Sequence, residues 1–150
     1  MTSPPPGSGD HHSARATFAA DPGAVSAARR YTRQKLTDWG AAAGQSAAAS
    51  LIVSELASNA VRHAASGFGL SLTRDHDVLR IVVSDTSEVA PVSRHPDPGA
   101  TSGFGLNIVS NLASDWGYVM RDFGKEIWVQ LADIPKWDLA PPDSPSAHPL

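Results

Sequence analysis

Three polar side chains recur at four-residue spacing inside the most apolar helical stretch of this sequence. Glu55, Asn59 and His63 lie in segment 47–65, which otherwise consists largely of Ala, Leu, Ile and Val. Residues at i, i+4 and i+8 stack along one face of an α-helix. A carboxylate, an amide and an imidazole therefore form one polar stripe on a helix built for a core. Because buried polar groups are costly unless something satisfies them, this stripe is a candidate functional site.

The composition fits one soluble domain and argues against several classes of partner. The chain has 150 residues, enough for one domain with a real core, and a formal net charge of −3. This charge gives no electrostatic reason to expect nucleic acid or an anionic membrane as a partner. The lack of cysteine excludes disulfides and Cys-ligated metals. Because the sequence has neither a leader nor an apolar run long enough to span a bilayer, we expect a cytoplasmic protein.

Both ends of the chain have the composition of disordered tails. Residues 1–13 consist largely of Pro, Gly and Ser, and residues 135–150 are rich in Pro. Neither segment can bury enough apolar surface to offset the entropy of ordering. The globular domain is therefore expected at residues 14–134. We interpret His11 and His12 as solvated residues of the first tail.

Hydrophobic periodicity predicts the secondary structure between these tails. The predicted order is a strand at 15–19, helices at 22–40 and 45–65, two strands within 69–85, a loop at 86–102, a helix at 103–115, and strands at 116–123 and 125–131. The strand that ends at Asp85 is apolar on both faces, so we expect it to be central in the sheet. This order indicates an α+β fold, with helices on one face of a largely antiparallel sheet.

Two further features flank the long loop. Asp85 ends the central strand where the loop begins, and the sequence Gly103-Phe104-Gly105-Leu106 opens the helix where the loop ends. Glycines at a helix N-terminus let backbone N–H groups approach an anion closely, so this place is a candidate phosphate site. It is not a Walker A loop, because no Lys-Ser or Lys-Thr pair follows. It is not the dinucleotide fingerprint either, because Ile108 occupies the third glycine position.

Together these motifs resemble the GHKL ATPase superfamily. The shared layout is E-x-x-x-N within a helix, an Asp that ends a strand, a long loop, and G-x-G-L opening a helix. The sequences SELASNAVRHA, SGFGLNIVSNLASDWGY and GKEIWVQL are similar to the small bacterial anti-sigma-factor serine kinases and their actinobacterial relatives. The resemblance covers about residues 14–132. It implies a Bergerat ATP-binding fold, a two-layer α/β sandwich with a mixed, mainly antiparallel sheet.

The resemblance also implies a role for each candidate residue. Asn59 would hold Mg²⁺ through its side-chain oxygen, Glu55 would act as the general base, and Asp85 would accept a hydrogen bond from the adenine amino group. His63 is either a phosphate contact or a residue beside the negative end of the helix dipole. The loop 86–102 would be the ATP lid. The implied nucleotide-binding set is Asn59, His63, Asp85, Gly103, Phe104, Gly105 and Leu106.

The sequence departs from the family pattern directly after the central strand. The usual D-x-G-x-G is here Asp85-Thr86-Ser87-Glu88-Val89, which lacks both glycines. In the family these glycines let the backbone turn under the adenine ring. Ser87 and Val89 impose a different loop path, since β-branched residues avoid positive φ angles.

The resemblance leads to one favoured function and two alternatives. The favoured function is an ATP- and Mg²⁺-dependent protein serine kinase that binds a sigma factor or similar regulator and phosphorylates a small antagonist protein. We expect no direct contact with nucleic acid or membrane, and leave a homodimer open. The first alternative is a non-catalytic module of the same fold that sequesters a regulator. The second is an ATP-binding domain related to histidine kinases, which acts on a separate phosphoacceptor.

Overall fold

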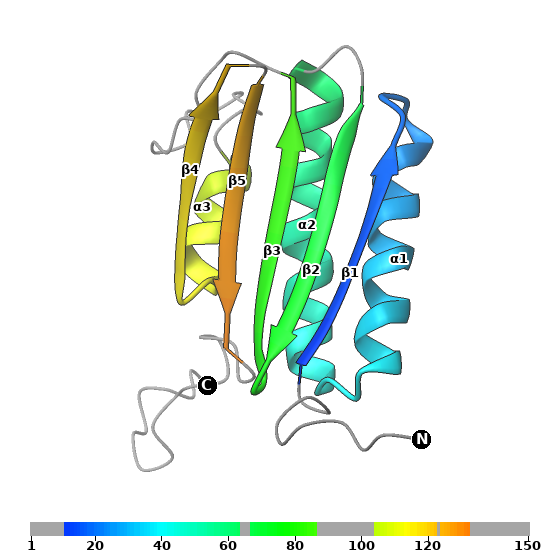
Figure 1. Ribbon diagram of the computed structural model, residues 1–150, viewed down its shortest axis with the longest axis vertical. Helices are drawn as coiled ribbons and strands as arrows, with labels where there is room; N and C mark the ends of the chain where they lie inside the picture. Colours follow the sequence, from blue (N-terminus) through cyan, green and yellow to red (C-terminus); the bar gives the residue numbers. More distant parts are fainter. Residues whose placement is uncertain (1–10, 64–66, 87–103, 123, 133–150) are drawn as a thin grey trace, which may run out of the picture.

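The protein forms a two-layer α+β sandwich in which three helices cover one face of a five-stranded sheet (Figure 1). The computed structural model describes residues 11–63, 67–86, 104–122 and 124–132. Among the helices of these segments, none has the length and apolar character needed to cross a membrane.

The order of elements along the chain agrees with the sequence prediction. The elements are β1 (His11–Phe18), α1 (Gly23–Asp38), α2 (Ala43–His63), β2 (Phe68–Asp75), β3 (Val78–Asp85), α3 (Phe104–Leu112), β4 (Asp115–Arg121) and β5 (Gly124–Leu131). The predicted turn between β2 and β3 is confirmed, because His76 and Asp77 both have positive φ angles, of 49° and 71°. Such a two-residue turn matches the twist of an antiparallel hairpin.

The sheet has the strand order β1-β2-β3-β5-β4, and every described pairing is antiparallel. The expected mixed sheet therefore contains no parallel pair within these strands. β3 is central, as predicted, but the reason given for it was wrong. Leu79, Ile81 and Val83 face the helices and are buried, whereas Val78 on the other face is 42% exposed. None of the described helices covers the second face, so its apolar residues remain partly in contact with water.

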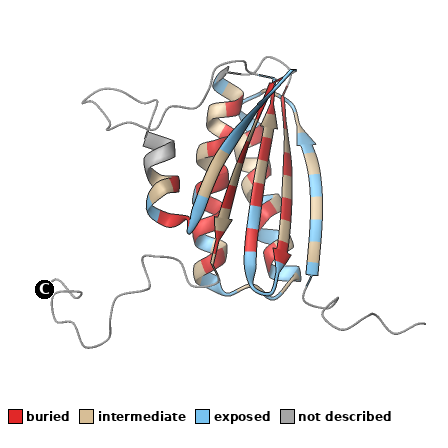
Figure 2. Cartoon of the chain, turned by 60° about the vertical axis from the view of Figure 1, so that its left-hand side comes forward, coloured by how far each residue is buried: buried red, intermediate tan, exposed pale blue. Residues whose placement is uncertain are grey.

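The core lies between the sheet and the helices, and α2 occupies its centre. α2 contacts α1 on one side, α3 on the other, and strands β2, β3 and β5 beneath it. The buried positions of α2 include the small residues Ala48, Ala49, Ala57 and Ala60, each with no exposed surface. Figure 2 shows buried positions alternating with less buried ones along the strands and recurring along the helices. The prediction of a buried, Ala-rich second helix is confirmed.

The first strand begins earlier than the sequence predicted. β1 starts at His11 and pairs in register with β2 from His11–Asp75 to Phe18–Phe68. The ring of His12 stacks on that of Trp39, with centroids 5.4 Å apart. His11 and His12 are therefore residues of a paired strand and not of a tail, although the His11 side chain is still 55% exposed. The pairing reaches His11 because the backbone hydrogen bonds of the strands do not depend on the side chains. The rest of the predicted first tail, residues 1–10, and the predicted second tail, residues 135–150, lie outside the described residues.

A buried polar network ties the lower end of the sandwich together. Gln45 near the start of α2 has no exposed surface, and its Nε2 donates to the carbonyl oxygens of Asp77 (2.9 Å) and Leu131 (3.2 Å). Its Oε1 accepts a hydrogen bond from Nε of Arg74, which is itself 7% exposed. The Arg74 guanidinium also pairs with the Asp77 carboxylate at 3.2 Å. One side chain thus links the first turn of α2 to β2, the β2–β3 turn and β5.

Replacing Gln45 with Ala should lower the free energy of unfolding by about 2–4 kcal/mol, because Arg74, Asp77 and Leu131 would each lose a hydrogen bond, and Arg74 and Leu131 are buried. Gln34→Ala is a matched control, since Gln34 is exposed on α1, and it should change stability by no more than about 0.5 kcal/mol. Urea denaturation monitored by circular dichroism measures both. Equal midpoints for the two variants would contradict a structural role for the Gln45 network.

Candidate functional site

Three elements carry the candidate residues to one end of the sandwich. α2 and β3 both run toward the upper end of the molecule in Figure 1, and α3 starts from that end. Asn59 lies in the last two turns of α2, Asp85 is the last residue of β3, and Phe104 is the first residue of α3. The topology therefore explains why we expect α2, Asp85 and the start of α3 to meet at one end of the molecule.

Glu55 and Asn59 lie at the rim of the core. Both residues are half-buried, whereas Leu56 and Ala57 next to Glu55 are at most 1% exposed. The helical period places the two polar side chains one above the other, one turn apart. They are therefore shielded on one side by the core and open on the other, which suits residues that meet a ligand. The side chain of His63, the last residue of α2, lies outside the described part of the structure.

Asp85 is buried at the end of β3 and forms an ion pair with Lys125. The Asp85 Oδ2 atom lies 3.6 Å from the Lys125 Nζ atom, and the two side chains are 3% and 4% exposed. Asp85 and Lys125 lie directly opposite each other in the antiparallel register of β3 and β5. Strand alternation places both side chains on the face of the sheet that the helices cover. The Asp85 carboxylate, which is the candidate group for recognition of adenine, thus has the Lys125 cation directly beside it.

Gly124 permits this close approach of β5 to the end of β3. It has a φ angle of 151°, and an added Cβ atom would lie 1.9 Å from the Asp85 carbonyl oxygen and 2.8 Å from the Thr86 Cα atom. Neither backbone atom could move away unless β3, or the chain that leaves it at Thr86, moved as well. The position of Asp85 relative to Lys125 therefore depends on a glycine that follows the β4–β5 turn.

The other predicted residues are only partly described. Gly103 and most of the predicted lid 86–102 lie outside the described residues, which include only Thr86 from that loop. Phe104, Gly105 and Leu106 form the start of α3, where the first backbone N–H groups of a helix have no partner within the helix. Their side chains are not described. A helix start at this point agrees with the sequence prediction, although α3 ends at Leu112, three residues earlier than expected.

Lys125 is the residue near Asp85 that sequence reasoning did not find. In β5 it shares its face with Ile127, Val129 and Leu131, all of which are buried. The two-residue period of a strand could have flagged it, because a lysine at a core-facing position requires a negative partner.

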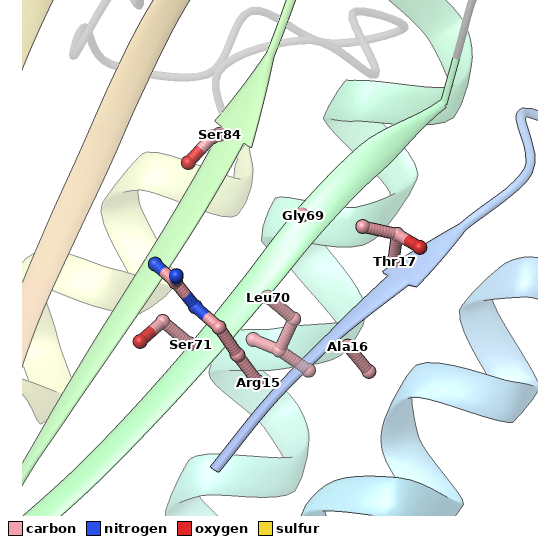
Figure 3. A pocket seen from close by; sticks show the side chains of 7 residues that line it. All are labelled: Arg15, Ala16, Thr17, Gly69, Leu70, Ser71 and Ser84. Atoms are coloured by element: carbon pink, nitrogen blue, oxygen red, sulfur yellow. The ribbon is translucent and has the colours of Figure 1, made fainter. Parts of the chain in front are cut away.

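The described cavities do not include the polar stripe. A cavity of about 390 Å³ lies on the uncovered face of the sheet, lined by Arg15, Ala16, Thr17, Gly69, Leu70, Ser71 and Ser84. Figure 3 shows the Arg15 side chain extending from β1 over β2. A second cavity, of about 230 Å³, includes Phe18, Phe68, Asp85 and Thr86. Neither lining contains Glu55 or Asn59.

The donor set suits a hard cation that keeps most of its waters. Asn59 offers an amide oxygen, one of the oxygen ligand types that hard cations such as Mg²⁺ accept. The carboxylate of Glu55, the candidate base, lies one helical turn away. Within the described residues there is no group of three or more His, Cys, Asp or Glu that could hold a metal ion. A metal here would therefore need ligands from water or phosphate as well as from the protein.

Comparisons with known proteins agree with this architecture. A family model described as "Histidine kinase-like ATPase domain" matches residues 18–131. A similar solved structure is that of the RsbU and RsbW domains of Rv1364c from Mycobacterium tuberculosis, with a TM-score of 0.64 and 20% sequence identity. The match covers 81% of this chain and 32% of that one, and at this identity the likeness concerns the fold. No curated protein matches the sequence.

Replacing Gly124 with Ala should lower the free energy of unfolding by about 3 kcal/mol or more, because the new methyl group overlaps the backbone at Asp85. Gly40→Ala is the matched control. Gly40 also has a positive φ angle, of 74°, but an added Cβ meets nothing within 4 Å, so only the backbone strain of about 1–2 kcal/mol should appear. Thermal and urea denaturation compare the two. Similar losses would show that β3 and β5 do not approach as closely as described.

Proposed function

The chain belongs to the histidine kinase-like ATPase domain family, and on that premise we propose that it is an ATP- and Mg²⁺-dependent protein serine kinase of the anti-sigma-factor type. It binds a sigma factor or a similar regulator and phosphorylates a serine of a small antagonist protein. Membership in the family implies ATP as the ligand of the domain. The serine specificity, the metal and the two protein partners are parts of the proposal, drawn from the sequence resemblance described above.

One observation carries the proposal above the others. Glu55 and Asn59 are half-buried on a helix whose neighbouring residues are buried almost completely. Partial burial of two polar side chains at the edge of the core lowers the stability of the fold, and a structural role does not explain this loss. Asp85 and the start of α3 lie at the same end of the sandwich. A carboxylate, an amide oxygen, an acceptor for a base and free helix N–H groups are the parts that phosphoryl transfer needs.

Each residue then has one task. Glu55 accepts the proton of the antagonist's serine hydroxyl as that oxygen attacks the γ-phosphorus and the bond to the ADP oxygen breaks. Asp85 accepts a hydrogen bond from the adenine amino group. The N–H groups at the start of α3 bind the phosphates, a role that the sequence resemblance also implies for Gly103. Asn59 holds Mg²⁺, which when bound supplies positive charge against the phosphate oxygens.

A non-catalytic binding module is the second candidate, and two observations favour it. Ser87 and Val89 stand where the family has glycines. The Asp85 carboxylate already has a cation, Lys125, at 3.6 Å. The negative charge of Asp85 is therefore balanced even when no adenine base is bound. In this case the same surface binds a regulator with little or no nucleotide turnover.

Incubation of the protein with labelled Mg-ATP and candidate antagonist proteins, followed by mapping of the labelled residue, separates the two candidates. The kinase proposal expects phosphoserine on an antagonist and none when Glu55 is replaced by Gln. Binding of the antagonist without any label transfer, under conditions in which Mg-ATP binds, would favour the non-catalytic module.

Asn59→Ala should abolish metal-dependent nucleotide binding, whereas Glu55→Ala should retain binding and lose transfer. A metal ligand acts in the ground state, and a general base acts mainly in the transition state, so binding and turnover should separate. Asn111→Ala on α3 is a matched control, because Asn111 is exposed. Calorimetry with ADP, with and without Mg²⁺, measures binding. Transfer by Glu55→Ala at the parent rate would refute the assignment of the base.

A further inference from the structure

Strand β4 forms an open edge of the sheet and exposes apolar side chains on both of its faces. Among the described strands it pairs only with β5, and it lies outermost in Figure 1. Three successive residues of β4 are 41–44% exposed: Tyr118, Val119 and Met120. An edge strand with exposed apolar residues is a template for pairing with another strand, which proteins normally cover or block.

One hydrogen bond shows which backbone groups of β4 point away from the sheet. The N–H of Trp116 donates to the Asp115 carboxylate at 2.9 Å, so this N–H faces away from β5. Because the direction of the backbone groups alternates along a strand, the N–H and C=O groups of Tyr118 and Met120 also point outward. These residues thus offer hydrogen bonds to a further strand.

We infer that β4 pairs with β4 of a second copy of this chain, in an antiparallel register centred on Tyr118. The strand reads Asp-Trp-Gly-Tyr-Val-Met-Arg, with one charged residue at each end. In this register Asp115 of each copy lies opposite Arg121 of the other, as the twofold axis of a symmetric dimer requires. Opposite charges directly across a strand pair stabilise it, whereas like charges destabilise it. The inference does not depend on the proposed kinase activity.

The same register agrees with the directions of the backbone groups. Residues that exchange both hydrogen bonds across an antiparallel pair must each have outward groups, and this register joins Tyr118 with Tyr118 and Trp116 with Met120. A shift by one residue would place outward groups opposite inward ones. A shift by two residues would keep the hydrogen bonds, but Asp115 and Arg121 would no longer face each other. The register centred on Tyr118 therefore satisfies the backbone and the charges together.

Apolar side chains also meet on both faces of this strand pair. On the open face, Val119 lies opposite Gly117 of the other copy, in a pair without hydrogen bonds, where side chains approach most closely. The Trp128 ring already covers Gly117, because an added Cβ atom there would lie 2.8 Å from the Trp128 Cζ2 atom. Val119 of the second copy therefore contacts this ring. On the other face Met120 approaches Trp116, and contact of a thioether with an aromatic ring is favourable.

The first measurement is the mass of the chain as a function of its concentration. A pair of seven-residue strands is small beside a standard interface of about 1,600 Å², so the dimer should be weak. In sedimentation equilibrium the mass should rise from 15.7 kDa toward twice this value as the protein concentration increases.

Charge reversal then tests the register itself. In Asp115→Arg two guanidinium groups face each other at each end of the pair, and in Arg121→Asp two carboxylates do. Each variant alone should therefore dimerise about tenfold or more weakly than the parent. An equal mixture of the two variants should restore the dimer, because every new charge then faces its opposite. Asp38→Arg is the matched control, since it reverses an exposed carboxylate on α1, and it should dimerise as the parent does.

Several results would overturn the inference. One is a mass of 15.7 kDa at every concentration. Another is a dimer that both charge variants retain at the parent affinity, because it would have to form through a different surface. Loss of the dimer in both variants without recovery in the mixture would also contradict the register, as would an equal loss in Asp38→Arg. Asp115→Arg leaves the ion pair of Arg121 with Glu126 in place, so it decides the matter even where Arg121→Asp fails to fold.

Discussion

The rest of the structure depends on how closely α2 packs against the sheet. Alanines at positions 48, 49, 57 and 60 have no exposed surface, and their small side chains let the helix backbone approach β2, β3 and β5 on one side and α1 and α3 on the others. Where the packing is this close, a polar side chain on the helix needs partners of its own, as Gln45 has. Glu55 and Asn59 lie instead at the rim of the core, toward the end of α2, where β3 ends and α3 begins. The position of the candidate site follows from the packing of one helix.

Buried charged side chains have different kinds of partners at the two ends of the sandwich. At the lower end, the Arg74 guanidinium donates to Gln45 at 2.9 Å, to Asp77 at 3.2 Å and to the Trp39 carbonyl oxygen at 3.4 Å. At the upper end, Asp85 and Lys125 form a looser pair at 3.6 Å, which is too long for a good hydrogen bond. The lower network fastens four elements and is suited to stability. The upper pair joins two almost completely buried side chains at the point where β3 ends.

Much of the fold could be predicted from the sequence, because period and turn chemistry act locally. The alternation in 69–85 and the turn at His76 and Asp77 gave the hairpin, and the apolar stretch around Glu55 gave α2. The early start of β1 could not be predicted, because the pairing of His11 with Asp75 depends on the length of a distant strand. The Asp85–Lys125 pair was missed for a similar reason. Strand alternation places Lys125 on the core face, but only the register of β3 with β5 identifies its partner.

The central claim is that a nucleotide binds on the helix side of the sheet, where α2, β3 and α3 meet, and not in the cavity on the uncovered face. Titration of the ¹⁵N-labelled chain with Mg-ADP, followed by amide NMR shifts, tests this most directly. We predict the largest shifts at Asn59, Asp85 and Lys125, with little change at Arg15 and Ser71, which line the open-face cavity. Shifts centred on Arg15 and Ser71, or none at all at millimolar Mg-ADP, would contradict the claim.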